Sequence, residues 1–329
     1  MHVAILYNQP PADASADDLD VLVQRDAVAA SLSRLAHNVS TIPCTLDLDT
    51  VHRQLVETRP DAVFNLVESL GGSDRLMPLA TVLLEALHLP YTGCRTPAII
   101  DTSDKLRAKS RMIAAGLPTP GWCTVPPVIP TPASAFVPGT YIIKAIAEHA
   151  SIGLDDTSVV TVSMPDELPA LIHDRSRRIG RACFAEQYID GREFNLSILA
   201  DESGPLVLPP AEIDFSTLST DKPRIVGYAA KWHSESDEYH QTPRTFDFPA
   251  SDAPILEQLI DLAQRCWTLF DLRGYARVDF RLDANGQAWI LEINANPCLS
   301  PDAGLAAALD QAGIPFDTAI GRILDAAMQ

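Results

Sequence analysis

Basic residues are scarce in this chain of 329 residues. Lysine and arginine together number 25, against 43 aspartate and glutamate residues, which gives a formal net charge of −18. Such a charge repels the phosphate backbone of nucleic acids unless a local basic patch or a bound cation intervenes. The sequence therefore argues against a nucleic acid as the general partner. Its hydrophobic content of 47% is that of an ordinary globular protein.

Long apolar runs, paired cysteines and a basic leader are also lacking. The most apolar window, residues 76–89, contains Pro78, Glu85 and His88 and is shorter than the ~20 residues of a membrane-spanning helix. The N-terminus predicts a first strand rather than a signal peptide, because no basic segment precedes a long apolar stretch. The six cysteines include no Cys-x-x-Cys pair, which is typical of reduced thiols. We therefore expect a cytoplasmic protein without a membrane partner.

Strand and helix signals alternate along the first part of the chain. Apolar segments at residues 3–7, 39–42 and 62–67 are separated by amphipathic runs, a βαβαβ pattern that predicts a parallel, Rossmann-like lobe. No Gly-x-Gly-x-x-Gly follows the first strand, which disfavours a nicotinamide-dependent dehydrogenase. Further along, seven prolines predict an extended connector near a lobe boundary: residues 118, 120, 126, 127, 130, 132 and 138.

The most informative segment is residues 274–294, where Asn285-Gly286 separates two alternating runs and predicts a β-hairpin. With a two-residue loop, Asp279 faces Glu292 and Arg277 faces Asn294. A four-residue loop shifts the pairing by two and leaves the same side chains on the same face. We therefore predict one face with these four polar residues and one apolar face formed by Val278, Phe280, Trp289, Leu291 and Ile293.

The facing carboxylates of Asp279 and Glu292 predict a metal site. Two carboxylates directly opposite one another in a sheet repel unless a cation lies between them. Oxygen ligands of this kind, here together with Asn294, suit Mg²⁺ or Mn²⁺, with substrate phosphates completing the coordination. The alternative is the solvated outer face of a surface hairpin.

Lysine usage gives an independent indication, because only five of the basic residues are lysines: Lys105, Lys109, Lys144, Lys222 and Lys231. Lys105 falls in the first turn of a helix capped near Thr102 or Ser103, where the helix dipole disfavours a cation unless a phosphate is near. Lys144 ends an apolar strand and precedes the polar loop 148–153, whose N–H groups and hydroxyl could bind phosphate. Snorkelling surface lysines are the alternative.

The segment 184–194 is an apolar strand and turn that carry Glu186 and, seven residues on, Glu193. In a nucleotide site the first could accept from an adenine amino group and the second from ribose hydroxyls. A buried glutamate in a structural ion pair is the alternative for Glu186.

Together, these motifs resemble an ATP-grasp ligase, specifically the D-alanine–D-alanine ligase family. The resemblance covers essentially the whole chain, in order, through residues 89–93, 104–107, 116–120, 143–153, 186–193, 230–232, 277–279 and 291–297. It implies an α/β fold with α+β lobes, in which a Rossmann-like N-terminal substrate lobe (1–98) is followed by two ATP-grasp lobes that clasp ATP. These are a central lobe with the phosphate loop (99–185) and a C-terminal lobe with the metal site (186–329).

The resemblance also implies roles for individual residues. Lys105, Lys144, Ser151 and Lys231 would bind the ATP phosphates, Glu186 and the Ile189 backbone the adenine, and Glu193 the ribose. Asp279, Glu292 and Asn294 would bind Mg²⁺. Catalysis would fall to Arg277, which would stabilise the tetrahedral oxyanion, with Ser151 and Lys231. Substrate contacts would come from Glu68, Trp232, Arg277 and Ser300.

Four departures from the family pattern lie on the substrate side. In the phosphate loop the family has two consecutive serines after a glycine, whereas here His149 and Ala150 precede the single Ser151. Trp232 stands where the family has a tyrosine, and Glu68 where it usually has histidine. The family's substrate-binding glutamate near the N-terminus has no clear equivalent between residues 8 and 18.

The sequence thus predicts a cytoplasmic, Mg²⁺- and ATP-dependent carboxylate–amine ligase that acts through an acyl phosphate on an amino acid or small peptide. Mn²⁺ is an alternative metal, and a homodimer is expected from the resemblance. Three other functions stay open: an authentic D-alanine–D-alanine ligase, an intramolecular ligase that forms a ring, and a non-catalytic ATP-binding protein. The retention of Arg277 argues against the last, because nucleotide binding alone needs no oxyanion binder.

Overall fold

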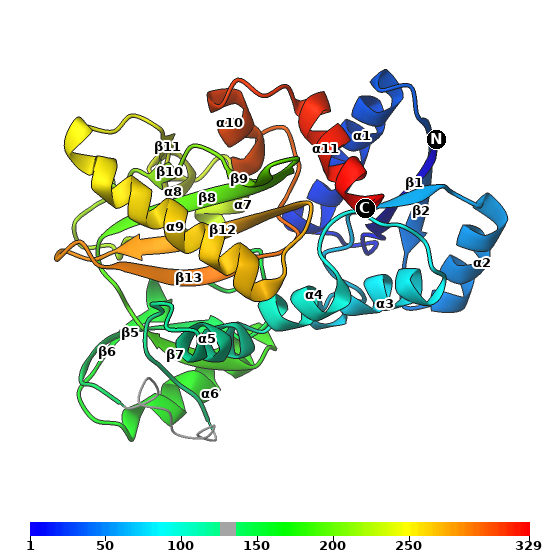
Figure 1. Cartoon of the computed structure of the whole chain (residues 1–329). Coiled ribbons are helices and arrows are strands. Elements are labelled where there is room, and N and C mark those ends of the chain that lie inside the picture. The colour runs from blue at the N-terminus through cyan, green and yellow to red at the C-terminus, as the bar shows by residue number, and fades with distance from the viewer. Residues whose placement is uncertain (126–135) are drawn as a thin grey trace.

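The computed structural model describes residues 1–125 and 136–329 (Figure 1). Within the expected connector, Pro126, Pro127, Pro130 and Pro132 lie outside the described residues. Three sheets organise the rest of the chain, and helices cover them. Within the described residues, no helix has both the length and the apolar character needed to cross a membrane.

The first sheet is parallel, with the strand order β2-β1-β3. It confirms the βαβαβ pattern, and its elements are β1 (His2–Asn8), α1 (Ala16–Arg34), β2 (Asn38–Cys44), α2 (Leu48–Thr58) and β3 (Ala62–Asn65). The central strand β1 is buried on both faces because side chains alternate along a strand. Val3 and Ile5 join the core that includes α1, whereas Ala4 and Leu6 join the core on the opposite side with α2.

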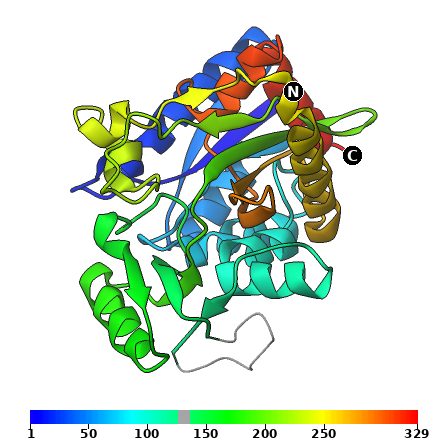
Figure 2. The same ribbon diagram turned by 90° about the vertical axis from the view of Figure 1, so that its left-hand side faces the viewer.

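Three helices lead from this sheet to the next: α3 (Pro78–Ala86), α4 (Thr96–Ser103) and α5 (Lys105–Ala114). The second sheet is antiparallel with the order β4-β7-β5-β6. Its strands are β4 (Trp122–Cys123), β5 (Gly139–Ala145), β6 (Val159–Val162) and β7 (Cys183–Gln187), and α6 (Glu167–Ile179) covers one face. This sheet and α6 form the green part at the bottom of Figure 2.

The third sheet is the largest and has the order β11-β10-β8-β12-β13, with β9 also paired to β8. Its strands are β8 (Arg192–Asp201), β9 (Gly204–Val207), β10 (Ala211–Ile213), β11 (Arg244–Thr245), β12 (Tyr275–Leu282) and β13 (Ala288–Asn294). Helix α9 (Ala253–Phe270) lies across one face, as Figure 1 shows, and packs Leu259, Ala263 and Cys266 against the sheet. The helical spacing of apolar residues in the sequence predicted this helix.

The last two helices, α10 (Gly304–Gln311) and α11 (Phe316–Ala327), return to the first sheet. Ile320 and Leu324 of α11 share a core with Val3 and Val28, and Arg34 of α1 pairs with Asp317 at 2.6 Å. In Figure 1 the red helix α11 accordingly lies beside the blue helix α1. The division into lobes at residues 98 and 185 stays a prediction.

The hairpin of β12 and β13 has the predicted register at its polar end and a different register at its turn. Arg277 faces Asn294 and Asp279 faces Glu292, which confirms the pairing expected from the sequence. The register then shifts by one residue, so that Phe280 pairs with Ile290. Because of this bulge the assignment of Trp289 and Leu291 to the apolar core face was wrong. Ala288 and Ile290 lie in the core instead.

Candidate active site

A single cavity of about 1170 Å³ collects nearly all of the predicted site residues. All three sheets and the loops beside them contribute to its lining: Glu68, Lys105, Lys144, Ser151, Glu186, Ile189, Glu193, Lys231, Trp232, Arg277, Asp279, Glu292 and Asn294. Ser300 is the exception among the predicted residues. It is wholly buried and its hydroxyl donates to Asp20 Oδ1 at 2.6 Å, so it adjoins the cavity through Asp20, which does line it.

The loop between β5 and β6 is held by the buried carboxylate of Glu148. One oxygen, Oε2, accepts from the backbone N–H of Ile152 at 3.0 Å, and the other lies 3.3 Å from Lys105 Nζ. Ser151 adopts a positive φ of 58° in this loop. Gly153 must be glycine, because its φ is +69° and a Cβ there would lie 2.4 Å from Ile179 Cγ2. The loop is thus fixed against α5 and α6 with Ser151 facing the cavity.

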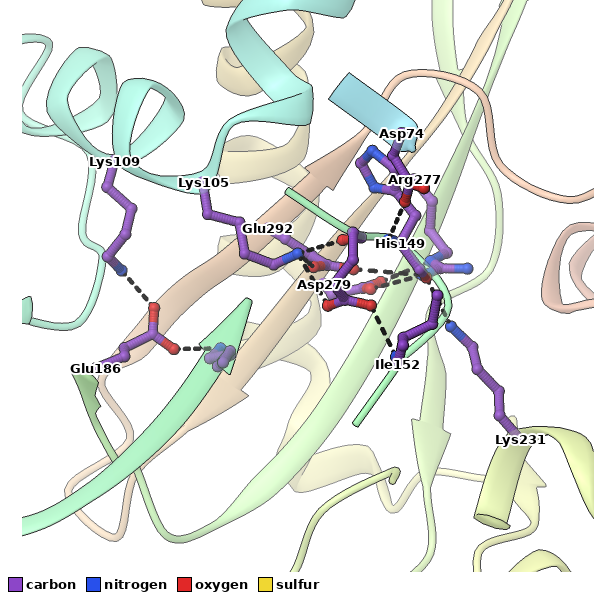
Figure 3. A network of polar contacts seen from close by, with 12 residues as sticks. Asp74, Lys105, Lys109, His149, Ile152, Glu186, Lys231, Arg277, Asp279 and Glu292 are labelled. Carbon is purple, nitrogen blue, oxygen red and sulfur yellow. Dashed lines mark hydrogen bonds and ion pairs between the residues drawn. The ribbon is translucent and has the colours of Figure 1, made fainter. Parts of the chain in front are cut away.

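Lys105 is only 4% exposed and lies between two carboxylates. Its Nζ is 3.3 Å from Glu148 Oε1 and 3.2 Å from Glu292 Oε2. Figure 3 shows Lys105 directed toward Glu292. The predicted helix cap at Thr102 or Ser103 was wrong, because those residues end α4. Asp104 caps α5 instead and accepts from the N–H groups of Leu106 and Arg107.

Glu186 contacts two lysines, of which Lys109 is labelled in Figure 3. Lys109 Nζ is 2.6 Å from Oε1, and Lys144 forms an ion pair with Oε2. Burial alone would raise the pKa of Glu186, but the two ammonium groups outweigh it and lower the pKa. Both carboxylate oxygens are therefore engaged by the protein, so Glu186 sets the position of Lys144.

Glu193 pairs with Arg281, whose Nη2 lies 2.8 Å from Oε2. Burial raises the pKa of Glu193, and Arg281 opposes this shift. The carboxylate lines the cavity beside Ile189 and Lys144. Arg281 also donates to the backbone oxygen of Gly191 at 3.0 Å, which fixes the turn between β7 and β8.

The polar face of the hairpin carries a bidentate pair between Arg277 and Asp279. Arg277 Nε and Nη2 each lie 2.8 Å from one oxygen of Asp279. Asn195 of β8 donates to the same carboxylate at 2.8 Å. Glu292 is close to both cations, at 3.2 Å from Lys105 and 3.9 Å from Arg277. Burial would raise the pKa of Glu292, but Lys105 and its other neighbours lower it strongly, so the carboxylate is ionised at neutral pH.

The donor set of this face fits a hard divalent cation. Asp279 and Glu292 offer carboxylate oxygens from facing positions, and the Asn294 side chain lies on the same face of β13. Among the described residues no three His, Cys, Asp or Glu side chains gather into a metal cage. Two carboxylates and an amide suit Mg²⁺, which commonly takes few protein ligands and completes its shell with phosphates and water.

A short helix, α7 (Tyr228–Trp232), closes over the loop 148–153. Lys231 Nζ donates to the backbone oxygen of His149 at 3.1 Å, and Trp232 Nε1 donates to that of Ala150 at 2.9 Å. Tyr228 contacts α1, where its hydroxyl donates to Asp17 Oδ1 at 2.6 Å. These contacts hold α7 against both sides of the cavity.

The opposite end of the cavity is acidic. Gln24 Nε2 donates to Glu68 Oε1 at 2.9 Å and to Asp20 Oδ2 at 3.1 Å, so that one amide joins the two carboxylates. Burial raises the pKa of Glu68 to about 7, and Asp20 and Asp74 add to the shift. Within the described residues neither Glu68 nor Asp20 has an ion pair with a cation.

Sequence reasoning missed several residues of this cavity. Lys109 was noted only for the rarity of lysine, although its spacing of four from Lys105 places both on one helix face. Asp20 and Gln24 are also four residues apart on one helix. Nothing in the sequence indicated that Gln24 would be almost completely buried. Asp74 and Arg244 gave no local signal, because their neighbours in space are distant in sequence.

The chain is similar to known ligases along nearly its whole length. The family profile described as the C-terminus of D-ala D-ala ligase matches residues 140–325. The D-alanine–D-alanine ligase of Caulobacter vibrioides is 31% identical over 317 residues, which are 96% of this chain and 90% of that protein. The corresponding ligase of Moorella thermoacetica is 29% identical over 351 residues, and the alignment covers 100% of both proteins.

Solved structures show the same fold. The D-alanine–D-alanine ligase of Bacillus anthracis superposes with a TM-score of 0.73 at 19% identity, covering 100% of this chain and 97% of that one. Its complex with ATP gives a TM-score of 0.70. The expected ATP-grasp fold of the α/β class is thereby confirmed. The chain belongs to the D-alanine–D-alanine ligase family and is an ATP-grasp ligase, an enzyme that forms a C–N bond as ATP is converted to ADP and phosphate.

Proposed function

We propose that this ligase joins the carboxylate of one amino acid or small peptide to the amine of another, with a substrate site that differs from that of D-alanine–D-alanine ligases. The observation that carries this proposal is the bond of 2.9 Å from Trp232 Nε1 to the backbone oxygen of Ala150. The resemblance puts a tyrosine and a serine hydroxyl at these two positions. Here an indole and a methyl group replace them, so the hydroxyls that would orient the first substrate are gone.

The nucleotide end is proposed to bind ATP through four side chains. Lys105, Lys144 and Lys231 supply positive charge around the loop 148–153, and Ser151 supplies a hydroxyl from the loop itself. Lys144 is held in place by Glu186, and Lys105 by Glu148. The Ile189 backbone and Glu193 are proposed to bind adenine and ribose, with Glu186 beside the adenine.

The polar face of the hairpin is proposed to hold Mg²⁺ through Asp279, Glu292 and Asn294. Bound there, Mg²⁺ would offset the charge of the phosphates. The ionised state of Glu292 and the bond from Asn195 to Asp279 keep the carboxylates ready as ligands. Mn²⁺ has the same ligand preference, so the choice between the two metals stays a prediction.

The reaction we propose begins with attack of the substrate carboxylate on the γ-phosphate of ATP, which forms an acyl phosphate and releases ADP. Attack of an amine then forms the C–N bond and releases phosphate. Arg277 is proposed to stabilise the oxyanion of the tetrahedral intermediate, a contribution of about 3 kcal/mol for one well-placed donor. The helix α7 excludes water from the acyl phosphate through Trp232 and Lys231.

The acidic end is proposed to bind the substrate ammonium group. Glu68 and Asp20 form a pair of carboxylates that Gln24 joins, and a cation between them would lower the cost of keeping both ionised. Ser300 acts through Asp20 by donating to it. A substrate whose ammonium group binds here and whose carboxylate lies near the phosphates is an amino acid or a peptide with a free N-terminus.

The test is ADP release from Mg-ATP across D- and L-amino acids, supplied singly and in pairs, and across dipeptides. We expect release with particular substrates and little with D-alanine alone. Release that is greatest with D-alanine alone would favour an authentic D-alanine–D-alanine ligase and overturn the altered substrate site. Mass spectrometry of the product distinguishes a linear amide from a ring.

Two variants control this experiment. Glu292→Ala removes a proposed metal ligand and should abolish release. Glu257→Ala changes an exposed glutamate of α9, remote from the cavity lining, and should leave release unchanged. Absence of release with every substrate, despite tight Mg-ATP binding, would favour the non-catalytic alternative. A homodimer and a cytoplasmic location stay predictions.

A further inference from the structure

Arg244 is a cavity residue that the roles proposed so far leave unused. It stands on the short edge strand β11, where it pairs with Ile213 of β10. Its guanidinium is accessible from the cavity and close to Arg277. Desolvation lowers the pKa of Arg244, and the like charge of Arg277 lowers it further. Two guanidinium groups therefore face the same space.

The other cations of the cavity are mostly neutralised by the protein. Lys105 pairs with Glu148 and Glu292, Lys144 with Glu186, and Arg277 with Asp279. Arg281 likewise pairs with Glu193, and Arg181 lies 3.8 Å from Asp74. Among the described residues that line the cavity, only Lys231 and Arg244 lack a carboxylate within ion-pair distance.

These two unneutralised cations lie against different parts of the chain. Lys231 donates to the backbone oxygen of His149, which places it at the loop proposed to bind phosphate. Arg244 instead donates from Nη1 to the backbone oxygen of Asp302 at 3.2 Å, in the segment that leads into α10. Asp302 follows Ser300, one of the proposed substrate residues, by two positions, so we place Arg244 at the substrate end of the cavity.

The side chain of Arg244 is exposed and makes few contacts with the protein, which leaves most of its donors available. Gly304 has no side chain, and a Cβ there would lie 3.8 Å from Arg244 Nε, so the guanidinium packs beside the start of α10. One donor is used by Asp302. Arg277 is the other guanidinium at this place, and its Nε and Nη2 are already bound to Asp279. An anionic group entering here would thus find more free donors on Arg244 than on Arg277.

We propose that Arg244 is a specificity-determining residue that binds a substrate carboxylate, one distinct from the carboxylate that is phosphorylated. A planar guanidinium binds carboxylates through two parallel hydrogen bonds, which makes arginine suited to this role. The inference rests on the proposed function, because it describes the amine-supplying substrate of that reaction. This substrate is then an amino acid or peptide with a free carboxylate, and simple amines and amino acid amides are rejected.

The experiment uses the full-length enzyme and the substrate pair that gives ADP release in the screen above. The amine-supplying amino acid is compared with its C-terminal amide at saturating concentrations of the other substrates. For the unchanged enzyme we expect kcat/KM to be at least about tenfold higher for the acid, as suits a charge-assisted hydrogen bond. In Arg244→Gln the KM for the acid should rise until acid and amide differ by less than about threefold.

Further measurements separate this role from a structural one. Arg244→Lys should keep part of the preference for the acid over the amide. Lysine retains the positive charge but lacks the planar guanidinium that makes two parallel hydrogen bonds. Arg265→Gln, on the exposed face of α9, should behave as the unchanged enzyme. The KM for ATP should not change in Arg244→Gln, and a rise would place Arg244 at a phosphate and overturn the inference.

The remaining outcomes are also decisive. An undiminished preference for the acid in Arg244→Gln, or equal use of acid and amide by the unchanged enzyme, would overturn the inference while the ligase proposal stands. A screen without any ADP release would remove the proposed function and this inference with it.

Discussion

Lys109 and Glu186 form an ion pair in which Nζ lies 2.6 Å from Oε1 and each side chain is 1% exposed. The pair joins α5 to β7, and Lys144 of β5 holds the second oxygen of Glu186. Thr119 accepts a further bond from Lys109 at 2.7 Å. The end of the cavity that we propose to bind the nucleotide is therefore attached to the body of the protein through buried charges.

Replacing Lys109 by methionine should destabilise the protein. The change leaves Glu186 buried with one cation instead of two, and breaking a buried ion pair costs about 3 kcal/mol or more. Chemical denaturation should show this loss in the free energy of unfolding. The KM for ATP should rise, because Glu186, the partner that positions Lys144, is no longer held by Lys109. Lys222→Met is the matched control, because its pair with Glu238 is partly exposed and contributes less than about 1 kcal/mol. Equal stability of the two variants would contradict the prediction.

The stability of the protein should depend on pH through Glu68. Burial raises the pKa of this carboxyl from an ordinary value of 4.5 to about 7, so the folded state holds a proton that the unfolded state releases. Its contribution to stability is complete below pH 4.5 and is lost as the pH rises through 7. Between pH 5 and pH 8 the unchanged protein should lose roughly 2 kcal/mol relative to Glu68→Gln. If the free energies of unfolding of the two proteins changed with pH in parallel, the pKa of Glu68 would not be raised in the folded state.

The sequence was sufficient to predict the features of the fold that depend on local periodicity. Alternation along a strand places Asp279 and Glu292 on one face, and helical spacing defines α9. The bulge that moves Leu291 and Trp289 could not be predicted, because it depends on how Phe280 and Ile290 pack in the core. The cap of α5 was misassigned for a similar reason, since a preceding helix uses the residues that would otherwise form it.

The substrate end was less accessible to sequence reasoning. In the sequence, Glu68 stood out only as a departure from a family pattern. Its neighbour in the cavity, Asp20, lies 48 positions earlier in the chain and was not connected with it. What joins them is Gln24, a side chain that the packing of α1 buries almost completely. Arg244 and Arg277 line one cavity only because β11 and β12 belong to one sheet. Such contacts follow from tertiary structure and leave no trace in local spacing.

The bond between Tyr228 and Asp17 should couple closure of the cavity to productive ligation. It links α7 to α1 at 2.6 Å with a charged acceptor, an interaction of about 1.5–3 kcal/mol. Tyr228→Phe should therefore open the cavity to water and raise the ratio of ADP released to amide formed above one. Asp17→Asn should have the same effect. The double variant should be no worse than either single one, whereas additive effects would mean that the two residues act independently.

Restoring the family pattern at the substrate end should shift the enzyme toward D-alanine. Ala150→Ser combined with Trp232→Tyr puts two hydroxyls in place of the indole–backbone bond of 2.9 Å. Glu68→His then removes the carboxylate proposed to bind the ammonium group of the present substrate. Each buried polar group that gains or loses its partner changes discrimination by about 1–3 kcal/mol, so the combined variant should change the ratio of kcat/KM values by at least tenfold in favour of D-alanine.

The measurement is ADP release with D-alanine and with the preferred substrate for each single, double and triple variant. Ala30→Ser, at an exposed position of α1 outside the cavity lining, is the matched control for the added hydroxyl. An unchanged ratio in the triple variant would show that these three positions do not set the substrate.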